Sequence, residues 1–140
     1  MAYSAQILRL QARLEAIPLA VREAVQPALL KSGDELADMM KHFAESSRDT
    51  GALIDSIAVT PGGQSTPPYS QPGGSTIVPE NAVMITAGDQ AVRYAHLVEY
   101  GTSKMKAEPF FWPAYRLLKK RVTARMKRSV RRAVRTEWDQ

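Results

Sequence analysis

Residues 93–115 read RYAHLVEYGTSKMKAEPFFWPAY and gather six aromatic side chains around one glycine. The residues before Gly101 have the pattern of a short helix, which glycine readily ends because it adopts a positive φ without strain. Pro109 and Pro113 stand where the next helical pattern begins, and a proline there costs little because the first N–H groups of a helix lack partners. We therefore expect a rigid corner, in which a short helix, the connector TSKMKAE and a second helix starting near Phe110 meet.

The second helix of this corner is predicted to run from about Phe110 to Trp138 and to carry two stripes. Apolar residues recur along it every three or four positions, from Phe111 to Trp138. Beside them runs a basic stripe that consists of Arg121, Arg125, Arg128, Arg132 and Arg135. At 1.5 Å per residue the helix is about 43 Å long. A small domain does not need that length, so we expect its distal end to project or to pack on another chain.

The first 45 residues also carry apolar residues at spacings of three and four, which predicts helix. Pro18 and Pro27 interrupt this pattern, and each removes a backbone donor. We therefore expect two helices, at about 4–16 and about 18–46. Thr50 is a candidate N-cap for a single short turn that follows them.

The middle of the chain predicts a small antiparallel sheet with three strands, at 56–60, 75–79 and 81–88. The loop at 61–79 is rich in Gly, Pro and Ser, and we expect it to be mobile and, because of its length, functional. The whole chain is then one α+β domain, 1–140. It consists of a helical region at 1–46, the strands and loop at 50–90, and the short helix with the long basic helix at 93–140.

The residue types in this sequence argue against catalysis. Cysteine is absent, which excludes disulfides and thiolate metal sites. Of the two histidines, His42 has Asp38 one turn back and is expected on a solvated helix face, and His96 has no third histidine or clustered carboxylate nearby. His96 and Glu99 share one helix face, where we expect a hydrogen bond that fixes the turn. We therefore predict no catalytic, cofactor-binding or metal residue and no enzyme activity.

The net charge of +5 conceals a difference between the two parts of the chain. Residues 1–103 carry 7 Lys and Arg against 11 Asp and Glu, whereas residues 104–140 carry 12 against 3. The basic end calls for an anionic partner: nucleic acid, an acidic protein surface, or the acidic part of a neighbouring copy. The arginine stripe could bind phosphates without reading sequence, so a small non-sequence-specific nucleic-acid-binding protein is the alternative function. No secretory signal or apolar run of about 20 residues is visible, so we expect a soluble protein.

Three separated pieces of the chain resemble the tail-component, or tail-completion, family of lambda-like long-tailed bacteriophages. The matching positions are Thr50, Gly51, Leu53 and Ser56; then Tyr94, Ala95, Glu99, Tyr100, Gly101 and Thr102; then Ala107, Pro109, Phe110, Pro113 and Ala114. Their order and spacing agree with the family pattern over most of the chain. The first 45 residues and the loop at 61–79 carry no specific match.

The resemblance implies a structural virion protein without a cofactor, assembled in the host cytoplasm and located in the neck of the virion. Such a protein forms a homo-oligomeric ring, with six copies by analogy with neck rings, that completes the tail and joins it to the head. The implied partners are the connector or stopper, the tail terminator, the tail tube and packaged DNA. We expect the subunit interface at Tyr69, Tyr94, Tyr100, Gly101, Phe110, Phe111 and Trp112, because aromatic residues dominate such contacts. The arginine stripe is expected to face DNA or an acidic surface.

Overall fold

The computed structural model describes residues 5–45 and 50–139. The described chain forms four helices and two strands in an α+β arrangement, as the sequence predicts. The elements are α1 (Ala5–Ala44), α2 (Thr50–Asp55), β1 (Ala58–Pro61), β2 (Val83–Thr86), α3 (Ala95–Tyr100) and α4 (Phe111–Trp138).

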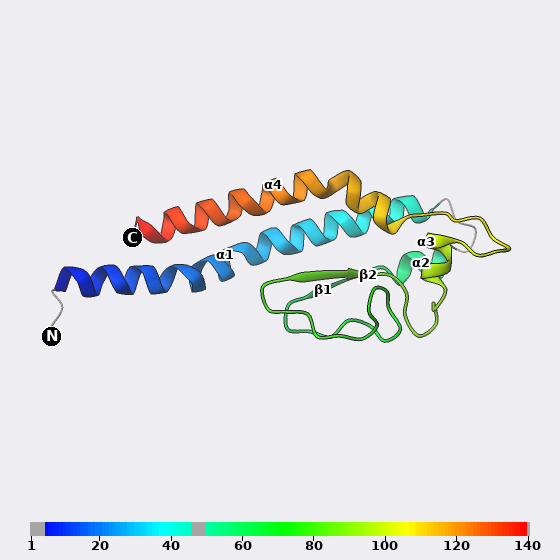
Figure 1. Cartoon of the computed structure of the whole chain (residues 1–140), viewed down its shortest axis with the longest axis horizontal. Helices are drawn as coiled ribbons and strands as arrows, with labels where there is room; N and C mark the ends of the chain where they lie inside the picture. The colour runs from blue at the N-terminus through cyan, green and yellow to red at the C-terminus, as the bar shows by residue number, and fades with distance from the viewer. Residues whose placement is uncertain (1–4, 46–49, 140) are drawn as a thin grey trace.

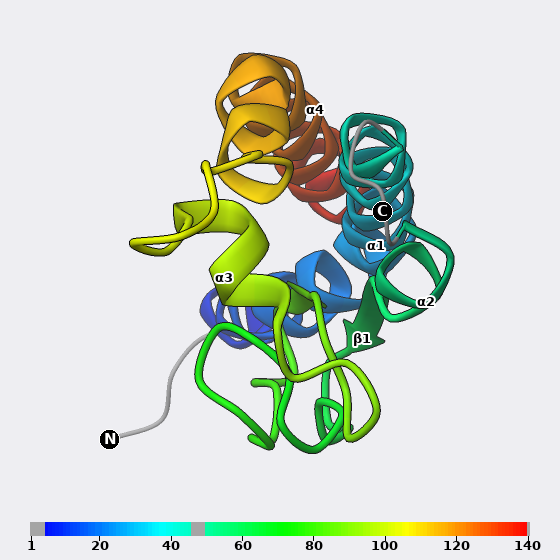
Figure 2. The ribbon, with the colours of Figure 1, turned by 90° about the vertical axis from the view of Figure 1, so that its right-hand side faces the viewer.

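The two long helices, α1 and α4, lie side by side and antiparallel and form one layer (Figure 1). The sheet and its loops lie below the C-terminal half of α1, and α3 lies on the same side of the layer (Figure 2). The 28 residues of α4 give it a length of about 42 Å, close to the predicted value. The guanidinium of Arg13 lies 4.5 Å from the centroid of the Trp138 ring, so α1 extends past the end of α4.

The prediction of two N-terminal helices is wrong, because α1 is one helix of 40 residues with Pro18 and Pro27 inside it. A proline in a helix interior breaks one hydrogen bond and kinks the axis, but it does not have to end the helix. Val25, which lies between the two prolines, is buried. Packing therefore holds the segment helical, and the ribbon changes direction there without breaking (Figure 1).

The sheet contains two antiparallel strands, in which Ala58 pairs with Thr86 and Pro61 with Val83. The strand predicted at 75–79 is not formed, and only a single bridge joins Ile77 to Ser65. Backbone hydrogen bonds flank this bridge, from the N–H of Val78 to the carbonyl of Gln64 at 2.9 Å and from the N–H of Thr66 to the carbonyl of Thr76 at 2.8 Å, and Val78 is buried. Pro79 has no N–H to donate, so it cannot extend the pairing into a ladder.

The loop at 61–79 contains its own hydrogen bonds, which its composition did not indicate. The buried hydroxyl of Thr66 donates to the carbonyl of Gly74 and accepts from the N–H of Thr76, each at 2.8 Å. Gln71 and Ala87 exchange two backbone hydrogen bonds, which join the loop to the chain directly after β2. The mobility of this loop stays a prediction.

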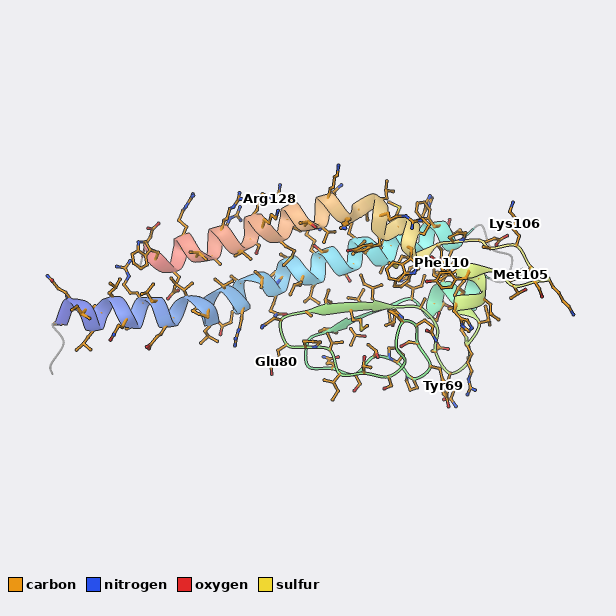
Figure 3. All side chains as sticks on the ribbon, in the orientation of Figure 1. Tyr69, Glu80, Met105, Lys106, Phe110 and Arg128 are labelled. Atoms are coloured by element: carbon orange, nitrogen blue, oxygen red, sulfur yellow. The ribbon has the colours of Figure 1, made fainter. Side chains whose placement is uncertain are left out.

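The hydrophobic core lies at one end of the molecule, where α1 ends and α4 begins. Its largest fully buried side chains include Phe110, Met40 and Leu53, which come from the segment before α4, from α1 and from α2. Figure 3 shows Phe110 between the helical layer and α3. By contrast, no residue of α1 from Ala5 to Ala24 is buried. We call residues 5–24 the N-terminal arm.

Candidate subunit interface

The buried carboxylate of Glu99 joins α3 to the start of α4. Its Oε2 accepts the N–H groups of Phe110 at 2.7 Å and Phe111 at 3.0 Å, and its Oε1 accepts the N–H of Trp112 at 3.0 Å. The first N–H groups of a helix have no partner within the helix, and the helix dipole makes this end positive. A carboxylate therefore caps α4 from a distance of 11 to 13 residues along the chain. We call α3, residues 101–110 and the first turn of α4 the elbow.

Gly101 allows the chain to leave α3 and fold back. Its φ of 75° and ψ of 175° lie in a region that only glycine occupies readily. Its N–H donates to the carbonyl of Leu97 at 2.7 Å, which ends α3 as the sequence predicted. The connector then returns, and the N–H of Glu108 donates to the carbonyl of Val98 at 2.8 Å. Met105 and Lys106 stand at the outer tip of this connector (Figure 3).

Three aromatic side chains of the elbow are exposed and form what we call the aromatic patch: Tyr100, Trp112 and Tyr115. The indole Nε1 of Trp112 donates to the hydroxyl of Tyr100 at 2.7 Å. The Trp112 ring packs edge-to-face against that of Tyr115 with centroids 6.0 Å apart. These contacts hold the rings in place although Tyr100 is 67% and Trp112 37% exposed.

The other residues predicted for the interface are divided between the core and the surface. Phe110 is fully buried, and Tyr94 and Phe111 are partly buried against the core. Tyr69 is exposed at the tip of the long loop (Figure 3), where the Arg93 guanidinium lies 3.9 Å from its ring centroid. Their part in a subunit interface stays a prediction, and so does that of Gly101.

The arginine stripe is partly engaged within the chain. Arg125 donates to Glu35 Oε2 at 2.8 Å and to the Ser32 hydroxyl at 3.1 Å, and only 13% of its side chain is exposed. Arg121 Nε lies 3.0 Å from Glu35 Oε1. By contrast, Arg128, Arg132 and Arg135 are exposed and make no ion pair among residues 5–45 and 50–139. Contact of the stripe with DNA or an acidic surface stays a prediction.

The hydrogen bond from Arg125 lowers the pKa of Glu35 from its ordinary value of 4.5, helped by the charges of Arg125, Arg121 and Lys31 and opposed by desolvation. Because the pKa of Glu35 is lower in the folded state than in the unfolded state, its ionised carboxylate stabilises the fold at pH values above the pKa of the unfolded state. This contribution is lost as the pH falls through the pKa of the folded state.

We predict that Glu35→Gln lowers the free energy of unfolding by about 1 kcal/mol at pH 7, because the charge-assisted bond with Arg125 is lost. The difference from the wild type should shrink as the pH falls below 4.5, the ordinary pKa of a glutamate. Urea unfolding at pH 7, 5, 4 and 3 measures it. Asp34→Asn removes an exposed carboxylate one residue away and should show little pH-dependent change. A pH-independent difference for the Glu35 variant would contradict this account.

Sequence reasoning missed the two carboxylates that organise these contacts. It paired Glu99 with His96 on one helix face, whereas the carboxylate turns to the N-terminus of α4 and His96 is exposed. It assigned no role to Glu35, whose partner Arg125 lies 90 residues away. In the described residues, no three His, Asp or Glu side chains gather in a way that could hold a metal ion. No helix of the described chain is both long and apolar enough to cross a membrane.

The chain matches the family model described as "Bacteriophage HK97-gp10, putative tail-component" over residues 9–101. The match includes most of α1, for which the sequence pattern offered no specific motif, and it ends at Gly101, before the aromatic residues that open α4. Neither the curated proteins nor the solved structures yielded a match. Because the model covers well over half of the chain, this protein belongs to the HK97 gp10-like family of bacteriophage tail components.

Proposed function

We propose that this protein is a structural protein of the phage neck, where it forms a homo-oligomeric ring that completes the tail and joins it to the head connector. Six copies follow from analogy with other neck rings. Membership of a tail-component family supports the setting within the virion. The observation that carries the ring is the aromatic patch, which is exposed although the elbow beneath it is held by the Glu99 cap.

The aromatic patch suits a protein partner for two physical reasons. Tyr and Trp are enriched among the residues that dominate binding energy. The hydrogen bond between Trp112 and Tyr100 also orders both side chains before binding, so less rotamer entropy is lost on association.

A ring built head to tail needs a second surface that differs from the first. The N-terminal arm offers one, because Leu8, Leu10, Leu14 and Leu19 are 44–60% exposed there. The arm and the elbow lie at opposite ends of the molecule, so one copy cannot join its own two surfaces (Figure 1). In the proposed ring, the arm of one copy therefore contacts the aromatic patch of the next.

Native mass spectrometry of the purified protein, alone and with the connector and tail-tube proteins, should show one closed ring. The variants Tyr100→Ala/Trp112→Ala and Leu10→Ser/Leu14→Ser should each weaken assembly by about tenfold or more, since truncating a central aromatic costs about 2 kcal/mol. A mixture of the two variants should stop at heterodimers, because each retains one intact surface. Ile77→Ala removes exposed apolar area elsewhere and should form rings.

Two results would count against the proposal in different ways. A wild type that stays monomeric with and without its partners would contradict the ring itself. Rings that form normally in both double variants would leave the ring intact and exclude the aromatic patch and the arm as its surfaces.

Arg128, Arg132 and Arg135 would remain exposed in such a ring for an anionic neighbour. Packaged DNA and an acidic surface of an adjacent stopper, terminator or tube protein both meet this condition. The free arginines are the observation that keeps the alternative function, non-sequence-specific nucleic-acid binding, open to test.

A further inference from the structure

A groove of about 610 Å³ runs between α1 and the C-terminal half of α4. Four alanines line it, and we call these its floor: Ala20, Ala24, Ala28 and Ala133. Residues four apart on a helix form one row, so the three alanines of α1 form a continuous shallow track. We call this hollow the alanine groove. It ends where Arg125 reaches across from α4 to Glu35.

The rim of the alanine groove is basic. Lys31, Arg128 and Arg132 line it and are exposed, and none of them forms an ion pair within the described parts of the chain. Figure 3 labels Arg128 on α4. Arg125, which also lines the groove, is already paired with Glu35, and Glu137 is the one acidic side chain of the lining. Three unpaired cations against one carboxylate leave the groove with a positive field.

We propose that the alanine groove binds an acidic amphipathic helix of a neighbouring tail or neck protein. The apolar ridge of that helix would lie on the alanine track, and carboxylates on its flanks would pair with Lys31, Arg128 and Arg132. Laying a helix into a groove between two helices is a recurrent mode of recognition. Small residues on the floor allow the close approach that buries such a ridge. This inference rests on the proposed function, which places other phage proteins next to this chain.

Two other occupants match the groove less well than an acidic helix does. The arm of a second copy carries Arg9, Arg13 and Arg22 against Glu15 and Glu23, so it brings no net negative charge to the basic rim. The α4 helix of a second copy is strongly basic and would bring like charges together. Duplex DNA would meet the basic rim, but its phosphate backbone has no apolar ridge that could lie on the alanines of the groove. An acidic helix satisfies the floor and the rim together.

The test uses the full-length protein and a fluorescent synthetic helix of roughly 15 residues, which spans the groove at 1.5 Å per residue. The probe carries alanine and leucine on one face and glutamate on both flanks, and its twin carries lysine in place of glutamate. Fluorescence anisotropy should show saturable binding of the acidic probe and at least tenfold weaker binding of its basic twin.

Two charge-reversed variants locate the site. Arg128→Glu/Arg132→Glu reverses two charges of the rim and should weaken binding of the acidic probe at least tenfold. Lys119→Glu/Lys120→Glu makes the same change in net charge on exposed residues of α4 that do not line the groove, and it should change affinity less than threefold. Circular dichroism checks that both variants keep the wild-type helix content.

Each outcome decides the inference. Failure of the acidic probe to bind would overturn it, and so would equal weakening of probe binding by both variants. If both variants also weakened the binding of a short DNA duplex to the same extent, the result would favour a diffuse phosphate-binding surface. If the Arg128→Glu/Arg132→Glu variant fails to form rings when no probe is present, the groove would instead be assigned to a second copy of this chain. Rings without probe binding would reject only the groove, whereas probe binding by a protein that never forms rings would reject only the proposed ring.

Discussion

Glu99→Ala is expected to lower the free energy of unfolding by about 3–4 kcal/mol. The substitution removes three charge-assisted hydrogen bonds at once, those to the N–H groups of Phe110, Phe111 and Trp112. One such bond to a charged group contributes about 1.5–3 kcal/mol, and donors that lose their partner inside the protein cost free energy as well. The loss of negative charge at the N-terminus of α4 adds to the effect.

Urea unfolding at fixed protein concentration, followed by circular dichroism, measures this loss. Glu108→Ala is the matched control, because it removes a carboxylate from the same connector but from an exposed side chain. It should change stability by less than about 0.5 kcal/mol. Glu99→Gln keeps the size of the side chain and one acceptor oxygen, so it should fall between the wild type and the alanine variant. Equal stabilities of the Glu99 and Glu108 variants would show that the carboxylate does not hold the elbow.

Gly101→Ala is expected to destabilise the protein by about 3 kcal/mol. Its backbone lies where a residue with a side chain is strained by about 1–3 kcal/mol. A Cβ there would also lie 2.7 Å from the backbone nitrogen of Ala107 and 3.0 Å from the carbonyl oxygen of Met105. Neither atom belongs to a flexible side chain, so the connector itself must shift.

The Gly73→Ala variant separates the backbone strain of a positive φ from the steric collision of an added Cβ. Gly73 also has a positive φ, of 85°, but a Cβ there meets nothing within 4 Å. Thermal and urea unfolding should therefore show a smaller loss for the Gly73 variant, about 1–2 kcal/mol. If both glycine variants lose the same stability, the close approach at Gly101 contributes nothing.

Both elbow substitutions should also disturb the aromatic patch, because Trp112 is held by Glu99 on its backbone and by Tyr100 on its ring. The fluorescence of Trp112, isolated by changing Trp138 to phenylalanine, reports this directly. In the proposed ring, a rigid elbow would hold the patch in place before a second copy binds, which lowers the entropy lost on association.

Much of the fold could be predicted because it depends on local patterns. The spacing of apolar residues located α4, and glycine chemistry located the end of α3 at Gly101. Local rules failed where packing overrode them. Pro18 and Pro27 predicted helix ends, but burial of Val25 between them holds α1 together. The residues around Ile77 had strand composition, but their pairing with residues 63–66 amounts to one isolated bridge, which Pro79 cannot extend because it has no N–H to donate.

The sequence by itself determined the α+β class, the short helix and the long basic helix at the C-terminal end, the charge difference between the two parts of the chain and the aromatic residues of the elbow. Those properties follow from composition and from spacings of three or four residues. Only the tertiary structure decided that Glu99 caps a helix that begins 12 residues later, and that Glu35 engages Arg125 whereas Arg128 and Arg132 stay exposed. The physical reason is that a hydrogen bond between distant segments depends on where the folded chain brings their atoms, and no periodicity records that position.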